Sequence, residues 1–202
     1  MIHVYFRINK EIIYVLRMKT LIVYGTRYGA TAGTSEEMAK VLREEGFKVR
    51  VVNLKDERVD DISDYELIII GSGLKFDRWA KEPEDFLKSF EEELGKKKVA
   101  VFVSSGVQAI YEHDGDSKAM ERAWKKNLEE KPEKHHLNPV AMAIFGGVFP
   151  LDRMGWVERR TFGQLWRKYE EAGFEKKNGV YDTRDWDAIR NWTKELARKV
   201  LD

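Results

Sequence analysis

The chain has 202 residues, of which 43% are hydrophobic and 35% are charged, and its formal net charge is +1 at pH 7. This composition is typical of a folded domain with a buried core, and it excludes a disordered chain. The near-zero charge gives no basis for binding nucleic acid. Since the chain contains no cysteine, disulfides, thiolate catalysis and cysteine-ligated metals are excluded. With no apolar run long enough to span a membrane, these features indicate a reducing, cytoplasmic location.

The first 17 residues differ from the rest of the chain. They mix apolar and basic positions around Asn9, Lys10 and Glu11, which makes a poor signal peptide. Met18 and the residues after it lead directly into the first predicted strand. We interpret residues 1–17 as an N-terminal extension and residues 18–202 as one domain. A small amphipathic anchor at a membrane surface is the alternative for the extension.

Short runs rich in valine and isoleucine alternate with helical patterns along the domain. Several runs are apolar at nearly every position, as expected of strands buried on both faces of a parallel sheet. The predicted strands are Leu21–Tyr24, Val49–Leu54, Leu67–Ile70, Val99–Val103 and Val140–Phe145. This alternation predicts an α/β fold with a doubly wound, five-stranded parallel sheet of order 2-1-3-4-5 and helices on both faces.

The helical patterns between these strands have recognisable ends. The first helix stops at Gly46, the second begins near Pro83 and ends before Gly95, and another covers Ser117–Glu130. Asp185 is predicted to cap the last helix. The apolar stripes are formed by Met38, Val41 and Leu42 in the first helix, by Phe86, Leu87, Phe90 and Leu94 in the second, and by Trp186, Ile189, Trp192 or Thr193, Leu196 and Val200 in the last.

The turn after the first strand, Thr26-Arg27-Tyr28-Gly29-Ala30-Thr31, carries two hydroxyls and a glycine ahead of a helix. The first amides of a helix lack internal partners and attract an anion, to which the hydroxyls add donors. The turn has neither the Gly-Lys-Ser/Thr of an ATP-type loop nor the Gly-x-Gly-x-x-Gly of a dinucleotide site. It therefore predicts a site for one terminal phosphate. Ordinary capping of the helix by Thr34-Ser35-Glu36-Glu37 is the alternative.

The pattern Thr26-x-x-Gly29-x-Thr31 after an initial strand resembles the FMN-phosphate loop of flavodoxins. Four longer stretches, "LIVYGTRYGAT", "IIIGSGLKFDRW", "AIFGGVFPLDRMGWVERR" and "YDTRDWDAIRNWTKELA", are similar to the menaquinone-dependent protoporphyrinogen dehydrogenase family. The resemblance covers nearly all of the chain from Met18 onwards. It implies a flavodoxin-like fold, bound FMN, and electron transfer from protoporphyrinogen IX, an intermediate of haem biosynthesis, to a membrane quinone.

The flavin ring is expected over the carboxyl ends of strands three and four. The resemblance places FMN contacts at Ser72-Gly73-Leu74-Lys75-Phe76 and at Ser104-Ser105-Gly106, where small residues allow backbone amides to approach the ring. Trp79 is read equally well as a packing aromatic or as part of this site. We expect no metal, and we interpret Glu112–Asp116 and His135-His136 as polar loops, because neither has the spacing of a metal site.

About thirty-five residues separate strand five from the last helix, and loops of that length are usually functional or structured. We interpret residues 148–180 as an insert. It combines apolar side chains with cations, which suits a quinone, a membrane interface or porphyrin propionates, although a helix packed on the sheet is equally consistent. These residues are Met154, Trp156, Phe162, Leu165 and Trp166, with Arg153, Arg159, Arg160, Arg167 and Lys168.

The leading hypothesis is an FMN-dependent oxidoreductase that acts on a porphyrinogen, has a quinone as acceptor and contacts the inner face of the cell membrane peripherally. A flavodoxin-like electron-transfer protein that serves another redox partner is the alternative, and a non-catalytic flavin module that senses redox state is a third reading. In the first two the flavin performs the chemistry, so no side chain is assigned as a catalytic acid or base. The sequence leaves the oligomeric state open.

Overall fold

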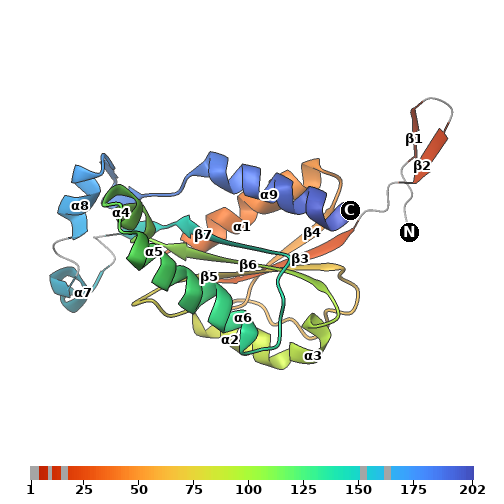
Figure 1. Ribbon diagram of the computed structural model, residues 1–202, viewed down its shortest axis with the longest axis horizontal. Coiled ribbons are helices and arrows are strands. Elements are labelled where there is room, and N and C mark those ends of the chain that lie inside the picture. Colours follow the sequence, from red (N-terminus) through yellow and green to blue (C-terminus); the bar gives the residue numbers. More distant parts are fainter. Residues whose placement is uncertain (1–4, 9–10, 15–17, 151–153, 162–164) are drawn as a thin grey trace.

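The computed structural model describes residues 5–8, 11–14, 18–150, 154–161 and 165–202. Its main body is a parallel sheet between two layers of helices (Figure 1). The sheet has the order β4-β3-β5-β6-β7. Counted along the chain, this is the predicted order 2-1-3-4-5, so the flavodoxin-like α/β fold is confirmed. Its strands are β3 (Lys19–Gly25), β4 (Lys48–Asn53), β5 (Leu67–Gly73), β6 (Lys98–Ser105) and β7 (Ala141–Gly146).

Helices cover both faces of this sheet. On one face lie α1 (Ala30–Glu44) and α9 (Trp186–Leu201), which pack on the sheet side chains Ile22, Ile69 and Phe102. The other face is covered by helices that pack on Leu21, Ile68 and Ile70. These are α2 (Lys81–Ser89), α3 (Glu91–Leu94), α5 (Ser117–Trp124), the π-helical turn η1 (Lys125–Glu129) and α6 (Glu130–Glu133).

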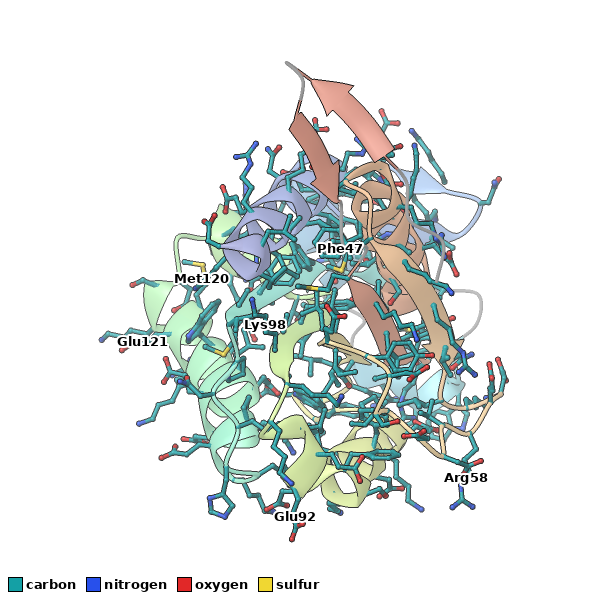
Figure 2. All side chains as sticks on the ribbon, turned by 90° about the vertical axis from the view of Figure 1, so that its right-hand side faces the viewer. Phe47, Arg58, Glu92, Lys98, Met120 and Glu121 are labelled. Carbon is teal, nitrogen blue, oxygen red and sulfur yellow. The ribbon has the colours of Figure 1, made fainter. Side chains whose placement is uncertain are left out.

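Burial on both faces explains the continuous apolar runs. Leu67, Ile68, Ile69 and Ile70 of β5 are all 0% exposed, because alternate side chains enter opposite cores. Each such side chain contributes roughly 1.5–3 kcal/mol by leaving water. In Figure 2, Phe47 lies among the buried side chains, whereas charged residues such as Arg58, Glu92 and Glu121 point outwards.

Several predicted boundaries need correction. Phe90 has a φ of −120°, so the predicted second helix is divided into α2 and α3. The predicted helix Ser117–Glu130 is α5, η1 and α6, and it continues to Glu133. Strand five is Ala141–Gly146 instead of Val140–Phe145. The cap at Asp185 is confirmed, because Asp185 Oδ1 accepts from the amides of Asp187 (3.0 Å) and Ala188 (2.9 Å).

The connection between β7 and α9 has structure of its own. It contains β8 (Val148–Pro150), α7 (Trp156–Thr161), α8 (Leu165–Glu171), β9 (Lys176–Lys177) and β10 (Val180–Asp182). The three strands form an antiparallel sheet of order β8-β10-β9. Within the expected N-terminal extension, β1 (Tyr5–Ile8) and β2 (Glu11–Tyr14) form a separate antiparallel pair. Among the described residues, no helix has the length and apolar character required to span a membrane.

Candidate functional site

The loop between β3 and α1 has the geometry of an anion site. Gly29 is the N-cap of α1 and has a φ of 91°, a left-handed conformation that glycine adopts without strain. Its amide donates to Thr26 Oγ1 at 3.1 Å, which closes the turn. Because α1 begins at Ala30, the first amides of the helix have no intrahelical acceptor. These amides and the positive end of the helix dipole favour a phosphate at this loop.

Thr31 carries a buried hydroxyl that fits a phosphate oxygen. Its side chain is 0% exposed, and within the described part of the chain Thr31 Oγ1 has no hydrogen-bond partner. A Cβ atom added to Gly73 would lie 3.1 Å from Thr31 Oγ1, so the end of β5 lies against the loop. The capping-box alternative is wrong, because α1 begins at Ala30 and Thr34 and Ser35 are buried inside the helix.

A basic hollow of about 450 Å³ borders the same loop. Thr26 and Tyr28 form part of its wall, and cations outnumber acids around it. A doubly charged phosphate gains from such cations through charge-assisted hydrogen bonds. The charged residues are Arg27, Lys55, Lys75, Lys81 and Glu82.

A second cavity, of about 250 Å³, lies at the carboxyl ends of β5 and β6. We call it the ring cavity. Residues that follow β5 (Leu74–Asp77) and β6 (Gly106 and Val107) form two of its sides, and Ser105 ends β6 there. Tyr28 and Tyr111 add aromatic surface from the phosphate loop and from α4 (Gln108–His113). An apolar and aromatic cavity with small residues at its edge suits a planar ring such as isoalloxazine.

The turn after β5 is a tight reversal with an unusual backbone. Phe76 and Asp77 have φ values of 49° and 57°, and positive φ at both central residues is the requirement of a type I′ turn. Lys75 and Arg78 exchange two backbone hydrogen bonds, of 3.0 and 3.1 Å. A side chain such as phenylalanine adopts this conformation at a cost of about 1–2 kcal/mol. Phe76 is 57% exposed, so the cost is not recovered by burying its ring.

The π-helical turn η1 holds this strained turn in place. Asn127 is 1% exposed and its amide donates to Asp77 Oδ1 (2.7 Å) and to the carbonyl of Ala123 (3.0 Å). Lys126 donates to Asp77 Oδ2 at 2.7 Å. Trp79 Nε1 donates to the carbonyl of Asn127 at 3.2 Å. Trp79 is 5% exposed in the core, so its packing interpretation is the correct one.

We expect Asn127→Leu to loosen the ring-cavity turn. The substitution leaves the carbonyl of Ala123 and one oxygen of Asp77 without these bonds, which costs about 1–3 kcal/mol of folding free energy. Thermal melts of the apoprotein and of the FMN complex measure both effects, and we expect the FMN-induced shift in Tm to shrink as well. Asn191→Leu, at an exposed position of α9, is the control and leaves that shift unchanged. An unaltered FMN-induced shift in the Tm of Asn127→Leu would contradict the role of Asn127 in holding the turn for FMN binding.

The insert supplies a wall of the ring cavity that the sequence did not locate. Phe149, Met154 and Tyr169 line the cavity together with Val148. Tyr169 is 0% exposed and donates from its hydroxyl to the carbonyl of Gly106 at 2.6 Å. Burial raises the pKa of Tyr169, which keeps the hydroxyl protonated as a donor. Its ring stacks on Tyr181 at 5.3 Å, so α8 and β10 are packed directly behind this wall of the ring cavity.

The insert leaves and rejoins the domain at one point. Thr183 donates from its amide to the carbonyl of Gly147 at 2.9 Å, and the amide of Gly147 donates to Thr183 Oγ1 at 3.0 Å. A Cβ atom at Gly146 would lie only 2.0 Å from the carbonyl oxygen of Thr183. The glycines after strand five therefore allow a close approach of backbone to backbone.

The structure brings most of the predicted site residues together at one edge of the sheet. Tyr28, Leu74–Phe76, Ser105 and Gly106 line the ring cavity, and Thr26 and Arg27 line the basic hollow. The hydroxyl of Ser72 has another role, because it accepts from the amide of Ala80 at 2.9 Å and so holds the segment after the turn. Ser104 Oγ is buried with no hydrogen-bond partner among the described residues. Residues of the cavity wall that the site prediction missed are Asp77, Val107, Tyr111, Ala123, Val148, Phe149, Met154 and Tyr169.

The charged and aromatic residues of the insert that the structure describes differ in exposure and in partners. Lys168 pairs with Asp114 at 2.5 Å, while Arg160 and Arg167 are exposed. Trp156 is 77% exposed, whereas Leu165 and Trp166 are half-buried and pack on the cluster around Tyr169. Arg153, Phe162 and the side chain of Arg159 lie outside the described residues.

Two segments interpreted as polar loops match that prediction in part, since residues 114–116 and 135–136 lie in turns or loops. Glu112 and His113 are the last residues of α4. His135 is only 5% exposed and lies 3.1 Å from Glu91 Oε2, so it is a buried, partnered histidine. Across the described ranges of the chain, no group of three or more histidine, aspartate or glutamate side chains is positioned to hold a metal ion.

Fold and site together define a doubly wound α/β protein that binds a flavin mononucleotide: a phosphate loop after the first sheet strand, a basic hollow beside it and an aromatic cavity at the neighbouring strand ends. Residues 21–175 match the family model described as a flavodoxin domain. The chain belongs to the flavodoxin domain family, and its cofactor is FMN. The orphaned hydroxyl of Thr31 and the aromatic walls of the ring cavity fit that cofactor.

Known proteins of two kinds are similar to this chain. Protoporphyrinogen IX dehydrogenase [quinone] of Escherichia coli (strain K12) is 22% identical over 181 residues, which is 89% of this chain and 95% of that protein. The flavodoxin of Clostridium beijerinckii is 30% identical over 112 residues, 54% of this chain and 72% of that protein. Among solved structures, a short-chain flavodoxin associated with a bacterial microcompartment has a TM-score of 0.54 at 13% identity, covering 91% of this chain and 99% of that one. Electron transfer through FMN is the activity that this family supports.

Proposed function

We propose that this protein is an FMN-dependent oxidoreductase that oxidises protoporphyrinogen IX and passes the electrons to a quinone. The observation that carries the proposal is the insert wall of the ring cavity. Phe149, Met154 and Tyr169 add apolar surface beside the expected ring, where a hydrophobic porphyrinogen or a quinone can be held. The similarity to the E. coli dehydrogenase, which covers 95% of that protein, supports the same choice.

In this proposal FMN and the protein have separate roles. FMN supplies the electron-accepting and electron-donating chemistry. The protein holds its phosphate at the Thr26–Thr31 loop, orients the ring between the two strand ends and excludes water from one side of the ring by means of the insert. The exposed ring of Trp156 on α7 suits contact with a membrane surface, where a lipid quinone is found, and we propose peripheral contact there.

A direct assay tests the proposal. The FMN-loaded protein is incubated without oxygen with protoporphyrinogen IX and a short-chain menaquinone. We expect porphyrin fluorescence to appear only when quinone is present, together with quinone reduction. A second function, electron carrier to another protein, is favoured by the 30% identity to the clostridial flavodoxin. Rapid reduction by a flavodoxin reductase, with no porphyrin formed, would establish the carrier in place of the enzyme.

A further inference from the structure

A third hollow, of about 500 Å³, lies on the other side of the Lys75–Arg78 turn from the ring cavity. We call it the basic groove. It runs between the start of α2 and the segment from η1 to the residues after α6, and it shares Arg27 and Lys81 with the basic hollow beside the phosphate loop. Asp77 lines both the groove and the ring cavity, so only the thickness of one turn separates them.

Positive charge dominates the groove. Among the described residues that line it, the acids are Asp77, Glu84 and Glu130, and the cations are Arg27, Arg78, Lys81, Lys126, Lys131 and Lys134. Three of the cations have local partners, because Lys126 pairs with Asp77 at 2.7 Å, Lys131 pairs with Glu84, and Lys81 pairs with Asp85 at 4.0 Å. Arg27, Arg78 and Lys134 are exposed, and the described chain offers them no ion pair. The groove therefore carries a positive field that is not cancelled by its own carboxylates.

The floor of the groove is rigid. Trp79 is 5% exposed, its indole N–H is bonded to the carbonyl of Asn127, and Lys131 Nζ lies 5.9 Å from its ring centroid. Asn127 and Lys126 both fix Asp77, as described above. The cations around this floor are thus attached to a preformed hollow and not to a mobile surface, which reduces the entropy lost when an anion binds.

We propose that the basic groove binds the carboxylate side chains of a tetrapyrrole whose macrocycle lies against the flavin ring held in the ring cavity. This inference rests on the proposed function for its substrate class, and it goes further by naming where the substrate is anchored. A tetrapyrrole of this class has an apolar macrocycle, puckered in the porphyrinogen and planar in the porphyrin, with carboxylates at one edge. The side of the flavin ring that the insert does not cover is where we expect the body, and the arginine fork of Arg78, next to Asp77 in the shared turn, suits a carboxylate.

The test measures binding of protoporphyrin IX to the FMN-loaded protein by tryptophan fluorescence quenching, without any turnover. Arg78→Gln/Lys134→Gln removes two groove cations, and Lys96→Gln/Arg198→Gln removes two exposed cations elsewhere as the matched control. We expect the groove variant to bind protoporphyrin about tenfold more weakly or worse, and the control to bind like the wild type. The FMN spectrum and FMN affinity remain unchanged in both variants. Protoporphyrin dimethyl ester, which lacks the carboxylates, binds weakly and equally to all three proteins.

Several results would overturn the inference. They are equal protoporphyrin affinities of the groove variant and the control, equal affinities of the acid and the ester for the wild type, and no binding by the wild type at all. Loss of sedimentation with phosphatidylglycerol vesicles in the groove variant, with porphyrin binding intact, would assign the groove to a lipid surface instead. If the groove variant loses porphyrin binding but the wild type transfers no electrons to quinone, the inference stands and the proposed function fails.

Discussion

Replacing Thr31 by valine is expected to weaken FMN binding about tenfold to a hundredfold while leaving the apoprotein at least as stable as the wild type. Valine has the same shape as threonine but no hydroxyl. Thr31 Oγ1 is buried with no partner in the described chain, so its removal relieves a desolvation penalty of about 1–3 kcal/mol. The same hydroxyl is expected to donate to the phosphate, and a hydrogen bond to a charged group contributes about 1.5–3 kcal/mol. The two effects therefore have opposite signs, and urea unfolding and flavin fluorescence titration measure them separately.

Thr34→Val is the matched control for this experiment. Thr34 lies in the same helix, is also 0% exposed, and its hydroxyl likewise has no partner among the described residues. Since the phosphate loop ends at Thr31, we expect Thr34→Val to stabilise the apoprotein without changing the affinity for FMN. Equal FMN affinities of Thr31→Val and Thr34→Val would show that the phosphate lies elsewhere.

The sheet could be predicted from sequence because its strands are buried on both faces. A run such as Leu67–Ile70 has no polar position, and its length and valine or isoleucine content separate it from a helix. The strands extend beyond those runs into Gly73 and Ser105, residues with no preference for strands, because pairing with neighbouring strands determines their conformation. The turn ahead of α1 could be predicted as well, since all its parts lie within the six consecutive residues 26–31, and its role as a phosphate site stays a prediction.

The rest of the site depends on contacts between distant parts of the chain. Asn127 supports a turn 50 residues earlier, and Tyr169 reaches a carbonyl 63 residues earlier. No local sequence pattern predicts such contacts, because an asparagine in a helix and a tyrosine in an amphipathic stretch are both common and do not indicate a distant partner. The π-helical conformation of Lys125–Glu129 escapes prediction for the same reason, since the sequence pattern there is that of an α-helix. The sequence did carry one indication that the insert contributes to the site, namely its length together with its aromatic residues.

Excision of the insert is expected to separate FMN binding from quinone-coupled oxidation. Thr183 already donates from its amide to the carbonyl of Gly147 at 2.9 Å, which is the bond that closes a two-residue hairpin turn. Residues 148–182, which are the insert and the two residues after it, can therefore be replaced by Asn-Gly, the dipeptide favoured in such turns. The parallel sheet and the Thr26–Thr31 loop are untouched, so we expect the shortened protein to fold and to bind FMN. Oxidation of protoporphyrinogen with quinone falls by about a hundredfold or more, because the wall formed by Phe149, Met154 and Tyr169 is gone.

Two control measurements decide what a loss of activity in the excised protein means. Tyr169→Phe keeps the whole wall and loses only the 2.6 Å bond to the carbonyl of Gly106, so it retains FMN and most of the quinone activity at a cost of about 1–3 kcal/mol in stability. Reduction by a flavodoxin reductase, followed as bleaching of the flavin absorbance, continues in the excised protein because the exposed edge of the ring is still present. A shortened protein that oxidises porphyrinogen at the wild-type rate would remove the insert from the reaction. In that case the strand ends alone would hold the substrate, and the wall would contribute only to the stability of the fold.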